Sequence, residues 1–279
     1  MPSLLINGVY HSCFFARPAE VIRTHLRDKP IALSNGRGAF SSSLAEYAIG
    51  ACLHFNKQFK RCEANRTGKV WDKFVMNTMA GKTMGFVGYG HIARSTAALA
   101  APFGLRLVAL RRHPEKAQAP DEKQRAAKKA RVSSEAEVRL AATFGPAEAA
   151  AFYSQCDFIV CSLPLTDESR GSVNAAAFAA MKPSAVFVSI GRGAAIDEAA
   201  LYEALSTGKI AGAACDVFTT EPLPQESPLW KCENLLMTAH NADLTADYTT
   251  LAFATWRENL EKFREGLPLA TPVDKSQGY

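Results

Sequence analysis

The sequence predicts an α/β fold: a doubly wound parallel sheet with a second, smaller domain. From Thr83 onward, short apolar runs alternate with helical patterns, which is the order that builds a parallel sheet. Each run is apolar throughout, as in strands that helices cover on both faces. The first run ends in a glycine-rich turn that leads into a helix. The predicted strands are 83–88, 105–110, 157–164, 185–190, 210–218 and 234–240.

The connecting helices are visible in their apolar content and end signals. One begins at Asp197 and stops near Gly208, where an acidic residue and a glycine mark its limits. Residues 41–61 predict one long amphipathic helix, with a strand at 30–36 ahead of it. After a basic, low-complexity segment, the sheet pattern resumes at 138–144. Further helices are predicted at 92–102, 145–155 and 174–181.

Length and composition fit two modest domains around a large core, because the 279 residues are 48% hydrophobic. The longest apolar runs are far shorter than the ~20 residues that cross a bilayer, and the N-terminus lacks a signal-peptide pattern. We therefore expect an intracellular, cytoplasmic protein with no membrane partner. The seven cysteines form no C-x-x-C pair, so we expect reduced core thiols and no metal site.

The net charge of +5 is concentrated in one segment. Residues 111–139 hold nine basic and five acidic residues and so supply +4 of it. Most of this segment, near 115–137, is rich in Ala, Lys and Glu and carries no strand pattern, which predicts a solvated helical or disordered insertion. Because the basic run has no interleaved aromatic residues, we expect no nucleic-acid partner.

The turn at residues 88–93 has the spacing G-x-G-x-x-A between a strand and a helix, which is typical of dinucleotide binding. Gly88 permits a tight turn, Gly90 lets backbone N–H groups approach a pyrophosphate, and Ala93 is small enough for close packing of the helix on the strand. An ordinary tight turn between a strand and a helix is the alternative.

Two arginines, Arg111 and Arg112, follow the second strand of this unit. An acid at this point binds the ribose hydroxyls of NAD, whereas a guanidinium can pair with the 2′-phosphate of NADP. We therefore expect NADP as the preferred cofactor, with NAD still possible. If the arginines only begin the basic insertion, this selectivity stays open.

Four further stretches, 164–171, 189–201, 212–224 and 238–243, complete a recognisable pattern with the turn. Together they resemble the NAD(P)-binding half of the D-isomer-specific 2-hydroxyacid dehydrogenases. The resemblance runs in order from about Ile31 to the C-terminus and is broken only by the basic insertion. It implies a Rossmann fold and an NAD(P)-dependent D-2-hydroxyacid dehydrogenase (EC 1.1.1.-).

Three side chains are the candidate catalytic groups, and each follows an apolar strand at the edge where α/β sheets hold ligands. Arg192 can offer paired donors to the carboxylate and carbonyl oxygens of a substrate. His240 can donate a proton to a keto oxygen, and Glu221 is the acid that the resemblance pairs with it. A surface arginine, a core histidine and a solvated glutamate are the structural alternatives.

The resemblance also implies a set of cofactor-binding residues. Asp216 would bind the nicotinamide carboxamide or hold the ring, against a structural capping role, and the others would bring backbone or small side chains to the dinucleotide, against plain loop geometry. Family members often have other residues at Ser169, Ser189 and Ala239, and Ala239 leaves the backbone before the histidine less constrained than proline would. The expected residues are Gly88, Tyr89, Gly90, His91, Ile92, Arg111, Arg112, Leu163, Pro164, Ile190, Gly191, Asp216, His240 and Ala242.

The domain division follows from the same resemblance. Residues 41–251 form the expected dinucleotide-binding domain, which includes an interdomain helix and the insertion. Residues 1–40 and 252–279 form the expected flavodoxin-like substrate domain, which is shorter than in the family and looks truncated. We expect a homodimer that interconverts small 2-keto and D-2-hydroxy acids, such as glyoxylate or hydroxypyruvate. The alternative is a catalytically impaired dinucleotide-binding sensor or scaffold.

Overall fold

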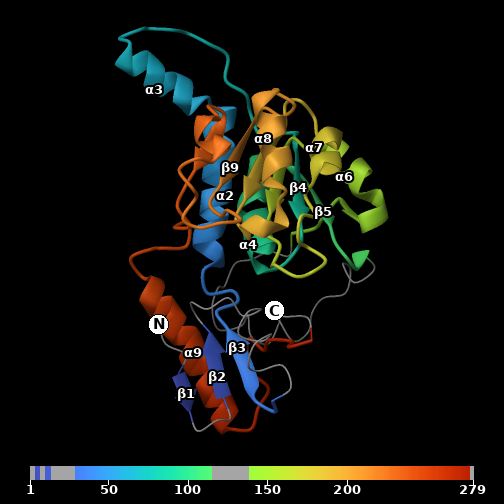
Figure 1. Ribbon diagram of the computed structural model, residues 1–279, viewed down its shortest axis with the longest axis vertical. Helices are drawn as coiled ribbons and strands as arrows, with labels where there is room; N and C mark the ends of the chain where they lie inside the picture. The colour runs from blue at the N-terminus through green and yellow to red at the C-terminus, as the bar shows by residue number, and fades with distance from the viewer. Residues whose placement is uncertain (1–3, 7–9, 14–28, 115–137, 277–279) are drawn as a thin grey trace.

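The computed structural model describes residues 4–6, 10–13, 29–114 and 138–276. The expected basic insertion near 115–137 lies outside the described residues. The larger part of the molecule is a seven-stranded sheet in the order β10-β9-β8-β7-β4-β5-β6, and every pair of neighbours is parallel. The predicted doubly wound sheet is therefore confirmed (Figure 1). Its strands are β4 (Thr83–Val87), β5 (Arg106–Leu110), β6 (Ala142–Phe144), β7 (Phe158–Cys161), β8 (Val186–Ser189), β9 (Gly212–Cys215) and β10 (Leu235–Met237).

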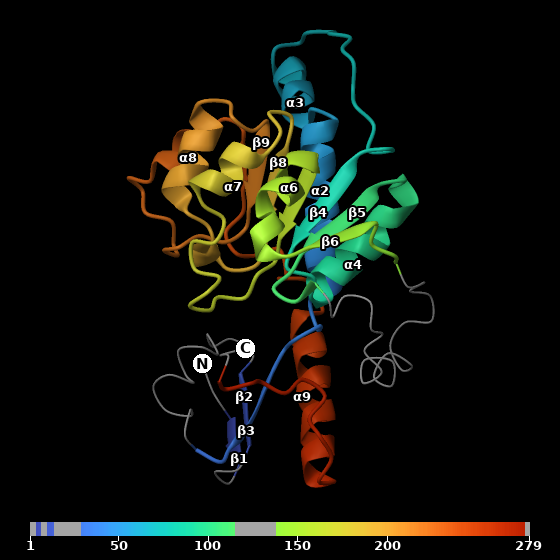
Figure 2. The same ribbon diagram turned by 90° about the vertical axis from the view of Figure 1, so that its right-hand side faces the viewer.

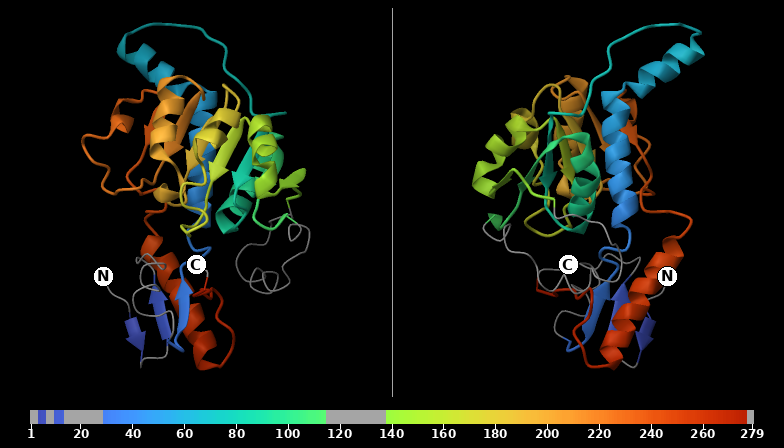
Figure 3. Two further views of the ribbon diagram at one scale, coloured as in Figure 1. Left: turned by 45° about the vertical axis from the view of Figure 1, so that its right-hand side comes forward. Right: turned by 180° about the vertical axis from the view of Figure 1, so that it is seen from behind.

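Helices cover both faces of this sheet, as the continuously apolar strands require. On one face, α2 and α4 pack through small residues such as Ala48, Ala93 and Ala97, all fully buried. On the other face lie α6, α7 and α8. Figure 3 shows α2 running along the sheet when the molecule is seen from behind. The helices are α2 (Ser41–Asn56), α4 (His91–Ala100), α6 (Ala149–Gln155), α7 (Ala175–Ala180) and α8 (Glu198–Ser206), with short 3₁₀ turns at η2 (Ala101–Phe103), η4 (Pro146–Glu148), η5 (Gly193–Ala195) and η6 (Pro228–Lys231).

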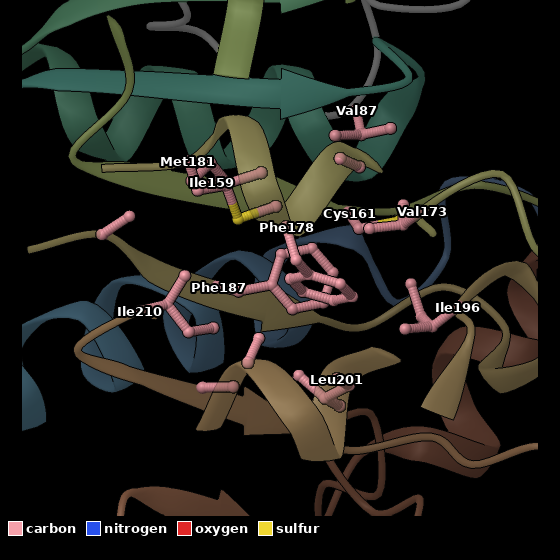
Figure 4. Packing of buried hydrophobic residues seen from close by; sticks show 14 of the residues in the cluster. Val87, Ile159, Cys161, Val173, Phe178, Met181, Phe187, Ile196, Leu201 and Ile210 are labelled. Carbon is pink, nitrogen blue, oxygen red and sulfur yellow. The ribbon is translucent and has the colours of Figure 1, made fainter. Parts of the chain in front are cut away.

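The core on the second face is built around aromatic side chains. Phe178 and Phe187 meet edge to face with their ring centroids 5.4 Å apart, and Ile159 and Leu201 belong to the same cluster (Figure 4). Gly85 shows how closely a helix approaches here, because a Cβ atom on it would lie 2.4 Å from Cys156 Sγ. Burial of this apolar surface is the main stabilising contribution to the larger part of the molecule.

One predicted helix is two helices in the structure. The expected helix over 41–61 stops at Asn56, and α3 (Phe59–Thr67) begins after a left-handed residue, Gln58, at φ 52°. A left-handed residue cannot continue a right-handed helix, so α3 takes a new direction away from the sheet (Figure 1).

The smaller part combines both ends of the chain. Strands β1 (Leu4–Ile6), β2 (Tyr10–Cys13) and β3 (Ala32–Asn35) form one sheet, and α9 (Tyr248–Arg264) lies in the same lobe (Figure 2). The segment after α9 returns to β3, where the Val273 N–H donates to the Leu33 carbonyl at 2.9 Å. This lobe faces the edge of the larger sheet at which its strands end (Figures 1 and 2).

Among the described residues, no helix has both the length and the apolar character needed to cross a membrane. The same residues contain no group of three or more His, Cys, Asp or Glu side chains placed to hold a metal ion.

The aromatic core gives a direct test of the packing. Phe187→Ala should lower the free energy of unfolding by about 3–5 kcal/mol, because the large buried ring is lost and a cavity remains. Urea unfolding measures this change. Phe253→Ala, which removes a ring that is 60% exposed, serves as the control and should stay within about 0.5 kcal/mol. Equal effects of the two substitutions would contradict the packing described here.

Candidate active site

The glycine-rich turn has the geometry that a pyrophosphate needs. Gly88 has φ +81°, and its N–H donates to the Leu110 carbonyl at 3.0 Å. Gly90 caps α4 without a side-chain hydrogen bond to the first turn, and a Cβ atom added to it would meet nothing within 4 Å. The first amides of α4 lie at the positive end of the helix dipole. Ala93, the last position of the G-x-G-x-x-A spacing, is fully buried, as close packing of α4 on the sheet requires.

The loops after β7 and β8 touch through backbone. A Cβ atom on Gly191 would lie 2.5 Å from the Leu163 carbonyl oxygen, so only glycine permits this approach. The Ile190 N–H donates to the Cys161 carbonyl at 3.0 Å, and the Pro164 carbonyl accepts a hydrogen bond from the Ser169 hydroxyl at 2.6 Å. The predicted cofactor residues of these two loops therefore lie together at one edge of the sheet.

Arginines gather at the end of β5. Arg111 is partly buried, and Arg112 pairs with Glu168 of the loop after β7. The Arg94 guanidinium lies 5.1 Å from the centroid of the Tyr89 ring. Burial raises the pKa of Tyr89, and the positive charges of Arg94 and Arg111 oppose that rise, which places both cations near its hydroxyl.

His240 and Glu221 form the central pair of the site. Nδ1 of His240 lies 2.8 Å from Oε2 of Glu221, and the other carboxylate oxygen accepts the Phe218 N–H at 2.9 Å. Their side chains are 41% and 26% exposed, so solvent and small molecules reach the pair. Because Nδ1 faces the carboxylate, Nε2 is the ring nitrogen that can meet a substrate oxygen.

Asp216 holds the loop that carries His240. Its buried carboxylate accepts hydrogen bonds from the Thr238 hydroxyl at 2.6 Å, the Asn241 N–H at 3.0 Å and the Ala242 N–H at 3.2 Å. Its backbone carbonyl accepts the His240 N–H at 2.8 Å. His240 has φ 53°, a conformation that costs free energy in a non-glycine residue, and these bonds hold it there. The predicted contact of Asp216 with nicotinamide stays a prediction.

Helix α2, which packs on one face of the sheet, also contributes to this hydrogen-bond network. The Thr238 hydroxyl also lies 2.9 Å from the Tyr47 hydroxyl of α2. Thr238 has a single hydroxyl proton, which goes to the Asp216 carboxylate, so Tyr47 is the donor to Thr238. Burial raises the pKa of Tyr47 to about 12, so this donor stays protonated even in alkaline solution. Ser43, also on α2, donates to the Ala242 carbonyl at 2.5 Å.

Arg192 follows β8 and is exposed, and its Nη1 donates to the Gly191 carbonyl at 2.8 Å. Asp243 links it to the pair: burial raises the pKa of this carboxyl, and the charges of His240 and Arg192 both oppose the rise. The side chains of His240 and Arg192 therefore both lie near Asp243, which follows His240 by three positions but carries no sequence motif that would predict its place in the site. The catalytic roles of Arg192, Glu221 and His240 stay predictions.

A glycine-rich turn and an acid–imidazole pair at the same edge of a parallel sheet are typical of the class of nicotinamide-dependent oxidoreductases. Residues 49–242 match the NAD binding domain of the D-isomer specific 2-hydroxyacid dehydrogenases. The chain belongs to this family. The expected family, Rossmann-type fold, enzyme class and use of NAD(P) are therefore confirmed.

Several relatives cover nearly the whole chain. A glyoxylate/hydroxypyruvate reductase A from Klebsiella pneumoniae is 27% identical over 100% of this chain and 85% of its own length. An NADPH-dependent glyoxylate/hydroxypyruvate reductase from Sinorhizobium meliloti, solved with NADP and sulfate, has a TM-score of 0.76 and 28% identity over 96% of this chain and 80% of its own. A D-isomer specific 2-hydroxyacid dehydrogenase from Xanthobacter autotrophicus Py2, solved with NADPH and MES, has a TM-score of 0.77 and 28% identity. The match covers 94% of this chain and 76% of that protein.

The Asp216 network yields a prediction for stability. Thr238→Val keeps the shape of the side chain but removes the hydroxyl that donates to the buried Asp216 carboxylate. It also removes the acceptor of the Tyr47 hydroxyl. The free energy of unfolding should fall by about 1–3 kcal/mol in urea titrations. The matched control is Thr67→Val on α3, where the hydroxyl is exposed and bonds only to its own helix, with an expected change below about 0.5 kcal/mol. No difference between the two variants would show that the network does not hold the loop.

Proposed function

We propose that this protein is an NADPH-dependent reductase that interconverts small 2-keto acids and D-2-hydroxy acids, with glyoxylate and hydroxypyruvate as candidate substrates. The observation that carries the proposal is the 2.8 Å contact between His240 and Glu221, placed at the sheet edge that the glycine turn also borders. A protein that only sensed a dinucleotide would have no chemical need for a paired acid and imidazole there. The names of the relatives from Klebsiella and Sinorhizobium support the substrate class.

The residues divide the reaction between them. The dinucleotide, when bound, supplies the hydride. Glu221 stabilises the protonated His240 ring through Nδ1, and Nε2 donates the proton to the keto oxygen and takes it back in the reverse direction. Arg192 presents a planar set of donors to the substrate carboxylate, of which the contact with Gly191 uses one.

The cofactor side of the proposal rests on the turn and the arginines. The uncapped first turn of α4 would hold the pyrophosphate, and the open space at Gly90 fits its approach. The guanidinium groups of Arg111 and Arg112 would pair with the 2′-phosphate, which favours NADP over NAD. The remaining predicted cofactor residues keep their proposed roles along the same edge.

We also propose the domain division given by the sequence, with residues 41–251 as the dinucleotide-binding domain and 1–40 with 252–279 as the substrate domain. The pairing of the C-terminal segment with β3 supports it, since the Thr271 hydroxyl donates to the Asn35 carbonyl at 2.6 Å. A reducing, cytoplasmic setting fits the free thiols of Cys52, Cys62, Cys156, Cys161, Cys215 and Cys232.

The central test is a comparison of His240→Ala with the unaltered protein. Turnover should fall by about 10²- to 10⁴-fold, because the general acid is lost. The absorbance of reduced nicotinamide reports turnover with glyoxylate, hydroxypyruvate and other 2-keto acids. His54→Ala, at the opposite edge of the sheet, is the control and should keep full activity. Tight NADPH binding by the unaltered protein without turnover of any keto acid would favour the sensor or scaffold alternative.

A homodimer is proposed through α3 and the segment that follows it. Trp71 and Val75 are 92% and 85% exposed, and Val70 and Phe59 add to the apolar surface. Large apolar groups gathered on one projecting segment are typical of an interface. Beside it runs a groove of about 1070 Å³ to which Trp230 contributes.

The dimer proposal is tested by charge. Trp71→Asp should convert the dimer to a monomer in sedimentation experiments, because a carboxylate would be desolvated at the interface. Phe253→Asp, on the exposed face of α9, is the control and should leave the dimer intact. A monomeric unaltered protein would refute the dimer without touching the proposed chemistry.

A further inference from the structure

The Arg112–Glu168 ion pair connects the loops on the two sides of the glycine-rich turn. Arg112 follows β5, and Glu168 lies in the loop after β7. These two strands flank β4 on its two sides, and β4 is the strand that leads into Gly88. The ion pair therefore joins the two loops that border the turn.

The ion pair engages Arg112, the side chain that the proposed function assigns to the 2′-phosphate of the cofactor. In this kind of unit, the residues just after the second strand meet the 2′ position of the adenosine ribose. A guanidinium there can bind a carboxylate or a phosphate through the same N–H groups. The Glu168 carboxylate and a 2′-phosphate would thus compete for Arg112.

The competition is reversible because the ion pair is exposed. The side chains of Arg112 and Glu168 are 42% and 69% exposed, and an ion pair in such surroundings contributes little to stability. A 2′-phosphate, with more charge than a carboxylate, can displace Glu168.

The Glu168 carboxylate lies in a region that also holds several arginines. Arg94 and Arg111 both lie near Tyr89 of the turn, so two further cations lie on this side of the site. Glu168 introduces an acid into that region from the opposite loop. The preference for a 2′-phosphate is then weaker than the arginines alone would give.

We propose that Glu168 is a specificity-determining residue, which limits the selectivity for NADP over NAD by competing with the 2′-phosphate for Arg112. This inference rests on the proposed function, in which Arg112 meets the 2′-phosphate. It concerns only the adenosine end of the cofactor, so it can be tested without turnover.

The experiment measures binding of two probes by calorimetry. Adenosine 2′,5′-bisphosphate carries the 2′-phosphate, and adenosine 5′-monophosphate lacks it. In Glu168→Gln, the dissociation constant of the bisphosphate should fall about two- to fivefold at low ionic strength, and that of the monophosphate should stay the same. High salt should remove the gain, because the site is exposed.

Two further variants make the result specific. In Arg112→Gln the bisphosphate should bind more weakly, and adding Glu168→Gln to it should restore little, because the two residues act on one contact. Glu233→Gln breaks an exposed ion pair with Lys60 elsewhere in the molecule and should change neither probe. Thermal melting checks that all variants fold alike.

The outcomes separate the two proposals. If Glu168→Gln weakens both probes equally, Glu168 only orders its loop, and the inference is wrong. If the bisphosphate binds well but Glu168→Gln leaves it unchanged, or improves it equally without Arg112, the inference is again wrong and the proposed function stands. If the unaltered protein binds neither probe, the proposed function fails and the inference fails with it.

Discussion

The geometry of the site depends on one buried carboxylate, that of Asp216. It lies at the end of β9 and accepts hydrogen bonds from Thr238, Asn241 and Ala242, which lead into and out of the loop after β10. Those bonds fix His240 in a left-handed conformation and so aim its ring at Glu221. A buried carboxylate needs several donors to be stable, and the loop supplies them by adopting the shape that the proposed chemistry requires.

The same constraint ties the site to the rest of the fold. Tyr47 and Ser43 of α2 reach the loop after β10 through Thr238 and Ala242, so a helix of the larger lobe also supports the site. Parallel pairing of β8, β9 and β10 brings their three following loops to one edge. The rigid sheet thus places the reacting groups, and the loops between them carry the chemical variation.

Much of this was predictable from sequence because it depends on local patterns. Continuous apolar runs identified the strands, and the spacing of Gly88 and Gly90 identified the turn. Resemblance and the strand ends make Arg192, Glu221 and His240 candidate catalytic residues. The partners were not predictable, because Tyr47 and Thr238 are 191 residues apart and Arg112 meets Glu168 only when two loops converge.

Other features escaped prediction for local reasons. The break at Gln58 follows from a left-handed conformation that glutamine rarely adopts, so no residue pattern signals it. Asp243 carries no motif of its own, and its place near His240 and Arg192 emerges from the turn that Asp216 imposes. The sequence also does not show what a glycine contacts: Gly191 is required by the close approach of the Leu163 backbone.

The most direct test of the central claim is a crystal structure of the protein with NADP and oxamate, an unreactive analogue of a 2-keto acid. We expect Nε2 of His240 within hydrogen-bonding distance of the oxamate carbonyl oxygen, while Nδ1 stays on Glu221 and the Arg192 guanidinium binds the oxamate carboxylate. Oxamate bound away from these three groups, or a His240 ring turned from Glu221 in the complex, would contradict it.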